Sequence, residues 1–292
     1  MTYPNQNIPF YRQMGSLLRN ALDLLDQEGQ QEVFQFLKSQ QNADGGFKDR
    51  GGRSDLYYSL FGAMLLKAIK SEELFTEPVE GEPEIKAKLT QFIKSQASKD
   101  VFGFIEQCCL ALLQKELKIS RFSRIRTLLK ISGSFWKERY LINLSYRSFV
   151  LFLTLDAVLP LRGLLKRFSG KMLSRVEVNK HSPCSEIAAK VFLLKMLGKD
   201  GSDEQQLLKS FASESGGFRA FLHLEHADML STAVALFALK NAGCDLRLQT
   251  PVCLDFIQQN FVDGAFLSGD GDQTTDLEYT FYGLLALGTL AN

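Results

Sequence analysis

The sequence predicts an all-α protein whose helices form two concentric rings. One short motif recurs along the 292-residue chain, and each copy follows a short helical segment and precedes a long apolar one. The helical segments come in six pairs, and no window alternates apolar and polar residues as a strand would. A unit used several times in one chain indicates a repeat architecture. The motif reads Asp44-Gly45-Gly46-Phe47, then Ser215-Gly216-Gly217-Phe218, then Asp263-Gly264-Ala265-Phe266.

The expected helices follow from apolar periodicity and from the residues that start and stop helices. An N-terminal extra helix covers about 11–26. The six pairs after it cover about 30–40 with 55–69, 83–95 with 103–117, 121–131 with 136–158, 161–174 with 184–197, 203–212 with 228–242, and 251–260 with 276–290. The acidic linker at 72–84 is too short to separate domains, so we expect one domain over 1–292.

The two members of each pair differ in character. The first member is amphipathic, as at 34–38, and has one face suited to water. The second member is apolar almost all round, as at 233–239, and a helix of that kind must be surrounded by protein. We therefore expect the second members to form an inner ring that the first members enclose.

The recurring motif has local reasons for its residues. Gly45-Gly46 allows a positive φ and a tight exit from the outer helix, and Phe47 can fold back over that turn. An aspartate then stands at the start of each following inner helix, where its carboxylate can accept hydrogen bonds from first-turn amides. We interpret all three aspartates first as helix caps: Asp55, Asp228 and Asp276.

The repeated unit resembles one shared by protein prenyltransferase β subunits and by squalene and terpene cyclases. The residues that carry the resemblance are Phe36-Leu37-Lys38-Ser39-Gln40, Asp44-Gly45-Gly46-Phe47 and Asp55-Leu56-Tyr57-Tyr58-Ser59. Copies at about 33–69, 207–242 and 254–290 match well, the second pair is degenerate, and the third and fourth match only in helical pattern. The resemblance implies an (α/α)6 toroid with six inner and six outer helices.

The zinc site of the prenyltransferases does not carry over to this chain. In those enzymes an Asp-x-Cys motif opens one inner helix, and a His that opens a later inner helix completes the protein ligands. The first motif aligns with Asp228-Met229-Leu230, and the histidine position aligns with Tyr279. A leucine cannot bind a metal, so the resemblance argues against a zinc cofactor here.

The acid motif of class II terpene cyclases carries over in part. That motif is Asp-x-Asp-Asp-Thr, and its middle aspartate protonates an alkene or epoxide. Asp276-Leu277-Glu278-Tyr279-Thr280 places Glu278 at the proton-donor position, with Asp276 and Tyr279 beside it. Protonating an alkene needs a carboxylic acid that stays neutral and is strengthened by hydrogen-bond partners. The alternative is that Glu278 is an ordinary first-turn glutamate favoured by the helix dipole.

Aromatic residues at inner-helix starts are the candidates for a cavity mouth. The chain has 23 Phe and eight Tyr, of which most should be core. Those on the inner ring would line a central cavity, where aromatic faces can stabilise a carbocation. The candidates for the cavity and for substrate binding are Tyr57, Tyr58, Phe61, Tyr279 and Tyr282, together with Asp228.

Three carboxylates precede the last inner helix. Asp270, Asp272 and Asp276 lie within seven residues and could bind Mg²⁺ through oxygen ligands. Gly-Asp-Gly-Asp is also ordinary turn composition, and we favour a solvated turn, with no cofactor.

Positive charge is concentrated in the middle of the chain. Residues 118–180 hold 14 of the 34 Lys and Arg residues but only three of the 33 acids. Such a block favours an anionic partner, which can be a membrane surface or a prenyl diphosphate, or it is a solvated outer face. No nucleic-acid motif accompanies the charge, so we expect no nucleic-acid partner.

The cysteines and the start of the chain bear on the compartment. Five cysteines without CxxC spacing suit reduced thiols, and residues 1–5 lack a secretory signal pattern. We therefore expect a cytoplasmic protein, with peripheral membrane contact through 118–180 as an open alternative.

Together these observations favour an isoprenoid-processing enzyme. The leading hypothesis is protonation-initiated cyclisation of a polyprenyl chain or prenylated small molecule, an isomerase reaction, with Glu278 as the acid. One alternative is a zinc-less prenyltransferase-like enzyme that uses a prenyl diphosphate. The other is a non-catalytic toroid that binds lipid or protein.

Overall fold

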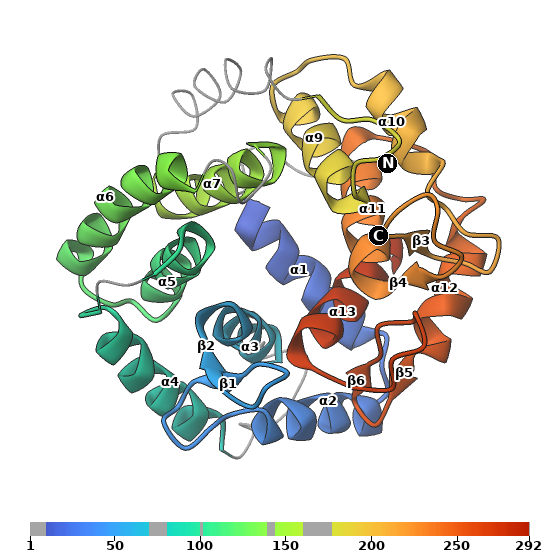
Figure 1. Ribbon diagram of the computed structural model, residues 1–292. Coiled ribbons are helices and arrows are strands. Elements are labelled where there is room, and N and C mark those ends of the chain that lie inside the picture. The colour runs from blue at the N-terminus through green and yellow to red at the C-terminus, as the bar shows by residue number, and fades with distance from the viewer. Residues whose placement is uncertain (1–9, 70–80, 100–101, 139–143, 160–176, 292) are drawn as a thin grey trace.

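Two rings of helices make up the protein. The structure is a computed structural model and describes residues 10–69, 81–99, 102–138, 144–159 and 177–291. The inner ring consists of α3 (Leu56–Ile69), α5 (Phe104–Glu116), α7 (Leu144–Val158), α9 (Cys184–Met196), α11 (Met229–Ala242) and α13 (Leu277–Ala291). The described outer helices are α2 (Gln27–Ser39), α4 (Glu82–Gln96), α6 (Arg121–Lys137), α10 (Ser202–Lys209) and α12 (Thr250–Gln259). Figure 1 shows the outer helices surrounding the inner ones, so the all-α toroid predicted from the sequence is confirmed.

The inner ring closes on itself. Each inner helix packs against the next along the chain, and α13 packs against α3. The difference in burial between the rings matches the sequence pattern: α3 and α11 are buried on nearly every face, whereas α2 buries only one side. The core is therefore continuous around the ring.

A small hairpin joins outer to inner helix at each copy of the motif. The strands have two residues each: β1 (Phe47–Lys48) with β2 (Ser54–Asp55), β3 (Phe218–Arg219) with β4 (Ala227–Asp228), and β5 (Phe261–Val262) with β6 (Ala265–Phe266). These strands were not predicted from the sequence, because two residues are too few to show an alternating pattern.

The motif phenylalanine fastens each hairpin to its inner helix. The Phe47 amide donates to the Ser59 hydroxyl over 3.0 Å, and the Phe218 amide donates to that of Thr232 over 2.8 Å. The Phe266 amide donates in the same way to Thr280 over 3.2 Å. All three phenylalanine side chains are fully buried. This contact explains the Ser or Thr that stands four residues after each capping aspartate.

The last hairpin closes the ring against the first outer helix. Gly264 has φ 75°, and a Cβ there would overlap the backbone of Glu32 in α2. Gly45, with φ 90°, approaches the backbone of Lys88 in α4 in the same way. The glycines of the motif thus serve close packing between successive repeats as well as the turn itself.

Helix α1 (Phe10–Asp23) lies across one end of the inner ring. It packs against α3, α7 and α13. The Phe10 amide donates to Asp156 over 2.9 Å, and Lys67 lies 6.0 Å from the centre of the Tyr11 ring. Since Lys67 and Asp156 belong to the last turns of their helices, α1 covers the carboxyl-terminal end of the ring (Figure 1).

The third helix pair corrects one predicted boundary. We expected an outer helix over 121–131 and an inner helix over 136–158, but α6 runs to Lys137 and α7 begins at Leu144. The prediction was wrong because Ser134 and Phe135 are buried against α5 and extend the outer helix beyond its basic segment. The helix expected at 161–174 lies outside the described residues. Among the described helices, none has the length and apolar character needed to cross a bilayer.

Candidate active site

A cavity of about 380 Å³ lies at the centre of the inner ring. All six inner helices and α1 contribute to its wall. The wall runs from residues in the first helical turns, such as Tyr57 and Leu230, to residues two turns further on, such as Met64 and Ala238. The end near the first turns therefore faces the hairpins, and the other end meets α1 at Tyr11 and Met14.

The described wall of the cavity is rich in aromatic rings. Nine of its residues are aromatic: Tyr11, Tyr57, Phe61, Tyr146, Phe149, Phe192, Phe237, Phe281 and Tyr282. Several pack edge to face, as Tyr57 and Phe61 do with ring centres 4.4 Å apart. Burial raises the pKa of Tyr146 to about 12 and raises those of Tyr57 and Tyr282 well above the usual value, so these phenols stay neutral at physiological pH. Such a wall suits an apolar ligand and presents π faces to any cation that forms inside.

Glu278 stands in the first turn of α13, next to this wall. Its carboxylate accepts a hydrogen bond of 2.8 Å from the Tyr57 hydroxyl and one of 3.3 Å from the Tyr58 hydroxyl. Tyr57 in turn has its hydroxyl 3.3 Å from that of Tyr282. Burial raises the pKa of Glu278, and the hydrogen bond from Tyr57 partly opposes that shift. A carboxyl group in these surroundings is held neutral to a higher pH, while two phenols stabilise its conjugate base.

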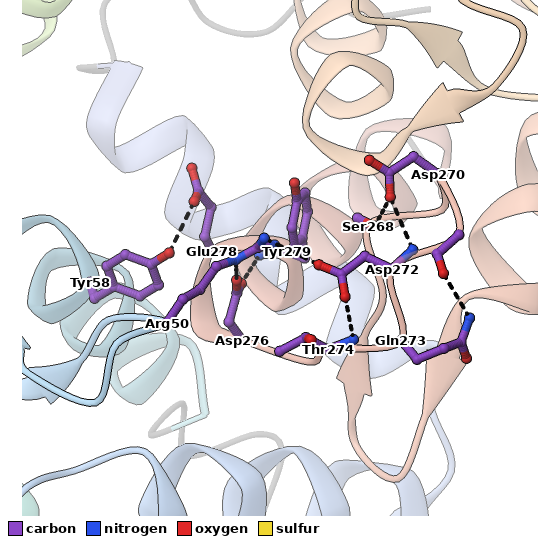
Figure 2. A network of polar contacts seen from close by, with 11 residues as sticks. Arg50, Tyr58, Ser268, Asp270, Asp272, Gln273, Thr274, Asp276, Glu278 and Tyr279 are labelled. Carbon is purple, nitrogen blue, oxygen red and sulfur yellow. Dashed lines mark hydrogen bonds and ion pairs between the residues drawn. The ribbon is translucent and has the colours of Figure 1, made fainter.

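Arg50 ties the first hairpin to the start of α13. Its guanidinium donates to Asp276 over 2.6 Å and to Asp272 over 3.2 Å, and it lies 4.8 Å from the centre of the Tyr279 ring. Burial lowers the pKa of Arg50, but the ion pair with Asp276 outweighs this and the net shift is upward. Figure 2 shows Arg50 between Glu278 and the acidic loop, with its charge directed at Asp276.

The three motif aspartates act as helix caps, as the sequence predicted. Asp55 accepts from the amides of Tyr57 and Tyr58. Asp228 accepts from the Ser231 amide over 2.9 Å, and Asp276 accepts from the Tyr279 amide over 2.8 Å. Burial raises the pKa of Asp228, whose second carboxylate oxygen is buried without a hydrogen-bond partner among the described residues.

The predicted site residues fall into two groups. Tyr57, Phe61 and Tyr282 line the cavity. The others are absent from its described lining and lie at its hairpin end: Tyr58, Asp228, Asp276, Glu278 and Tyr279. Glu278 joins the two groups, because it contacts the Tyr57 hydroxyl.

Glu186 also faces the cavity and was not predicted from the sequence. This residue lies in the first turn of α9, is half-buried, and carries the only formal charge in the described lining of the cavity. Burial raises its pKa. The available signal was an acid in the first turn of a mainly apolar helix. No copy of the motif precedes this helix, so no local pattern shows that Glu186 faces the cavity.

The aspartates of the acidic loop before α13 accept hydrogen bonds from other groups of the same loop. Asp270 accepts hydrogen bonds from the Ser268 hydroxyl and the Asp272 amide, and Asp272 accepts from the Thr274 amide over 2.9 Å (Figure 2). In the described parts of the chain, no three His, Cys, Asp or Glu side chains converge as a metal site would require. The geometry thus favours the turn interpretation of these aspartates.

Comparisons with known proteins bear on the fold. The structure is similar to that of the type II terpene cyclase MstE from Scytonema, with a TM-score of 0.58 and 11% sequence identity. The similarity covers 94% of this chain and 98% of the cyclase. No family model matches the sequence, and no curated protein does. The likeness therefore establishes a shared toroid, and the chemistry has to be argued from the residues.

Proposed function

We propose that the protein is an isoprenoid cyclase of the type II terpene cyclase class, which starts its reaction by protonating an alkene. The observation that carries this proposal is a half-buried carboxyl group, Glu278, set against a cavity with nine aromatic side chains in its described wall. The whole-length likeness to the type II terpene cyclase MstE is in keeping with it.

The reaction has the following balance. Glu278 gives its proton to one carbon of a terminal alkene, and the other alkene carbon becomes a cation. Further double bonds of the chain attack that cation in turn, so each ring closure moves the positive charge along the chain while the aromatic wall stabilises it. Loss of a proton from carbon ends the reaction, and the product is an isomer of the substrate.

Glu278 meets the two demands that alkene protonation makes on an acid. Burial raises its pKa and so favours the protonated form, and the hydroxyls of Tyr57 and Tyr58 stabilise the carboxylate left behind. Tyr57 itself is no candidate for the donor, because its pKa is raised well above that of a free tyrosine. A chain held in the cavity with its terminal alkene toward the hairpin end would bring that alkene to Glu278.

Glu186 is our candidate for the proton acceptor. Its carboxylate belongs to the cavity wall, and burial makes it a stronger base than a free glutamate. As the single formal charge in the described lining, it would also attract a cation formed inside.

The described lining argues against the diphosphate alternative. A prenyl diphosphate needs Lys, Arg or a metal ion, and none of the described lining residues is Lys or Arg. Arg50, the cation nearest to Glu278 in Figure 2, is already paired with Asp276 and Asp272.

The substitution Glu278→Gln tests the assigned acid. We expect turnover to fall by at least about a hundredfold, because the amide keeps the shape of the side chain but has no acidic proton. Glu186→Gln should still consume substrate but change the mixture of final alkenes. The exposed Glu225→Gln is the matched control, and its turnover should not change. Full turnover by Glu278→Gln would show that the acid is assigned wrongly.

A further inference from the structure

Helix α6 carries apolar side chains on its outward face. The exposed fraction is 80% for Phe122, 57% for Ile125, 72% for Leu129 and 58% for Trp136. Four of the ten exposed large apolar residues in the described chain thus lie on this one helix. Their spacing of three, four and seven residues places them in a single stripe.

The opposite face of α6 is the one that holds it to the protein. Thr127, Ile131, Ser134 and Phe135 are buried, and Phe135 packs edge to face on Phe104 of α5 with ring centres 5.4 Å apart. The helix is therefore fixed by its inner face, and the outer stripe contributes nothing to the core. An ordinary outer helix would carry polar residues there, as α2 does.

The charges beside the stripe have a single sign. Helix α6 contains five basic residues and no acidic one: Arg121, Arg124, Arg126, Lys130 and Lys137. On a helical wheel Arg121 falls on one side of the stripe, whereas Arg126 and Lys137 fall on the other. Basic side chains that flank an apolar stripe can reach anionic headgroups while the stripe enters the acyl region.

We propose that α6 is a membrane-docking helix that lies on the surface of an anionic lipid bilayer. Phe122, Ile125, Leu129 and Trp136 insert below the headgroups, and the flanking Arg and Lys side chains bind lipid phosphates. Charge complementarity selects this occupant, because a protein partner for an apolar stripe requires no surplus of five positive charges. The inference does not depend on the catalytic proposal.

Trp136 makes the proposal directly measurable, because it is the only tryptophan in the chain. We expect its fluorescence to shift to the blue when phosphatidylcholine vesicles containing phosphatidylglycerol are added. The shift should be smaller with pure phosphatidylcholine and should weaken as salt is raised. Co-sedimentation with the same vesicles gives the affinity independently of the fluorophore.

Three variants separate the apolar stripe from its charges. Phe122→Gln with Leu129→Gln should lower the affinity for phosphatidylglycerol vesicles by about tenfold or more for each side chain removed. Arg121→Gln with Lys137→Gln should lower it by about fivefold for each charge. Leu248→Gln is the matched control, because Leu248 is 89% exposed but lies on the turn before α12, and its vesicle binding should equal that of the parent.

Three results would overturn the proposal. The first is equal vesicle binding by the parent and by the Phe122→Gln, Leu129→Gln variant. The second is that the parent protein binds neither the vesicles with phosphatidylglycerol nor those of pure phosphatidylcholine. The third is a dimer in solution that this variant dissociates without any vesicle binding, since the stripe would then be a contact between two copies of the chain.

Discussion

Opposed influences act on the pKa of the Glu278 carboxyl group. Burial raises its pKa, and the hydrogen bond from Tyr57 lowers it, with a smaller lowering from Tyr58. The charge of Asp276 also raises this pKa, and that of Arg50 lowers it. Both phenols are neutral in the physiological pH range, so they can act only as donors to the carboxylate. Burial thus favours the neutral acid, and the hydrogen bonds from the two phenols favour its conjugate base.

This balance predicts the effect of Tyr58→Phe on the pH profile. The proposed cyclisation needs protonated Glu278, so kcat/KM should fall as pH rises through the pKa of that group. Removing the Tyr58 hydroxyl removes an influence that lowers this pKa, so the falling limb should move to higher pH. The plateau rate should also decrease, because the acid is weaker.

Tyr57→Phe provides the comparison for that measurement. The falling limb of the pH profile of Tyr57→Phe should also move to higher pH, and by more, because the Tyr57 hydroxyl has the larger effect on the pKa of Glu278. Tyr57 lines the cavity, whereas Tyr58 is absent from its described lining, so Tyr58→Phe leaves the described cavity wall unchanged. A limb that moves to lower pH in either variant would contradict the assigned role of Glu278.

For single residues, the sequence predicted the roles that depend only on neighbouring residues in the chain. The capping roles of Asp55, Asp228 and Asp276 follow from their position before an apolar run, and the structure confirms them. The contact of Glu278 with Tyr57 joins residues 221 positions apart, and the placement of Glu186 on the cavity depends on how α9 is rotated in the ring. No local pattern encodes either relation.

Among the elements, the link between hairpin and inner helix explains the motif best. A buried backbone amide of phenylalanine finds its acceptor in a helical hydroxyl, as between Phe218 and Thr232. The same hydroxyl donates to the carbonyl of Asp228 over 2.7 Å, so one side chain serves the cap and the hairpin together.

We expect Thr232→Val to destabilise the protein by about 2 kcal/mol. Valine keeps the shape of the side chain but leaves the Phe218 amide buried without an acceptor. Thr289→Val is the matched control, because Thr289 is also buried in an inner helix and its hydroxyl donates to the Leu285 carbonyl. That carbonyl is within a helix, so the control should lose less than about 1 kcal/mol. Urea denaturation followed by circular dichroism measures both, and equal losses would refute this role of the hydroxyl.

The boundaries of helices were predicted correctly where the repeats are regular. The prediction failed where the repeats are irregular. The ends of α3 and α11 agree with expectation because the motif marks them. The boundary between α6 and α7 was misplaced, because no motif copy stands there and tertiary burial of Ser134 and Phe135 decides where α6 ends.

At the scale of the whole molecule, the last repeat must meet the first for the ring to close. Two of the contacts at that junction are Gly264 against Glu32 of α2, and Arg50 of the first hairpin against Asp276, which precedes α13. The junction is also where the candidate acid lies, because Tyr57 and Glu278 come from the first and last inner helices.

Gly264→Ala should therefore destabilise the protein far more than Gly52→Ala, although both glycines have a positive φ. Gly264 has φ 75° and Gly52 has φ 80°, so both substitutions incur the strain of a left-handed residue, about 1 kcal/mol. A Cβ at Gly52 meets nothing within 4 Å, whereas one at Gly264 overlaps the α2 backbone. We expect a loss of about 3 kcal/mol or more at Gly264 in a urea titration. Similar losses at the two sites would contradict close packing at the junction.

The toroid was predictable from its repeats, but the wall of its central cavity was not. Three motif copies were enough to indicate the ring, because each unit buries its apolar helix only against its neighbours. The cavity wall draws on seven helices, and its volume and polarity depend on which side of each helix faces inward.

The most direct test of protonation-initiated cyclisation is mass spectrometry of products formed in heavy water. Linear polyprenyl substrates, with and without a diphosphate, would be incubated with the parent protein and with Glu278→Gln. Cyclisation started by Glu278 predicts a product that has the mass of the substrate in ordinary water and gains one deuterium from the solvent in heavy water. The parent should form this product, and the variant should not. A product that has lost diphosphate, or an isomer formed without solvent deuterium, would contradict this mechanism.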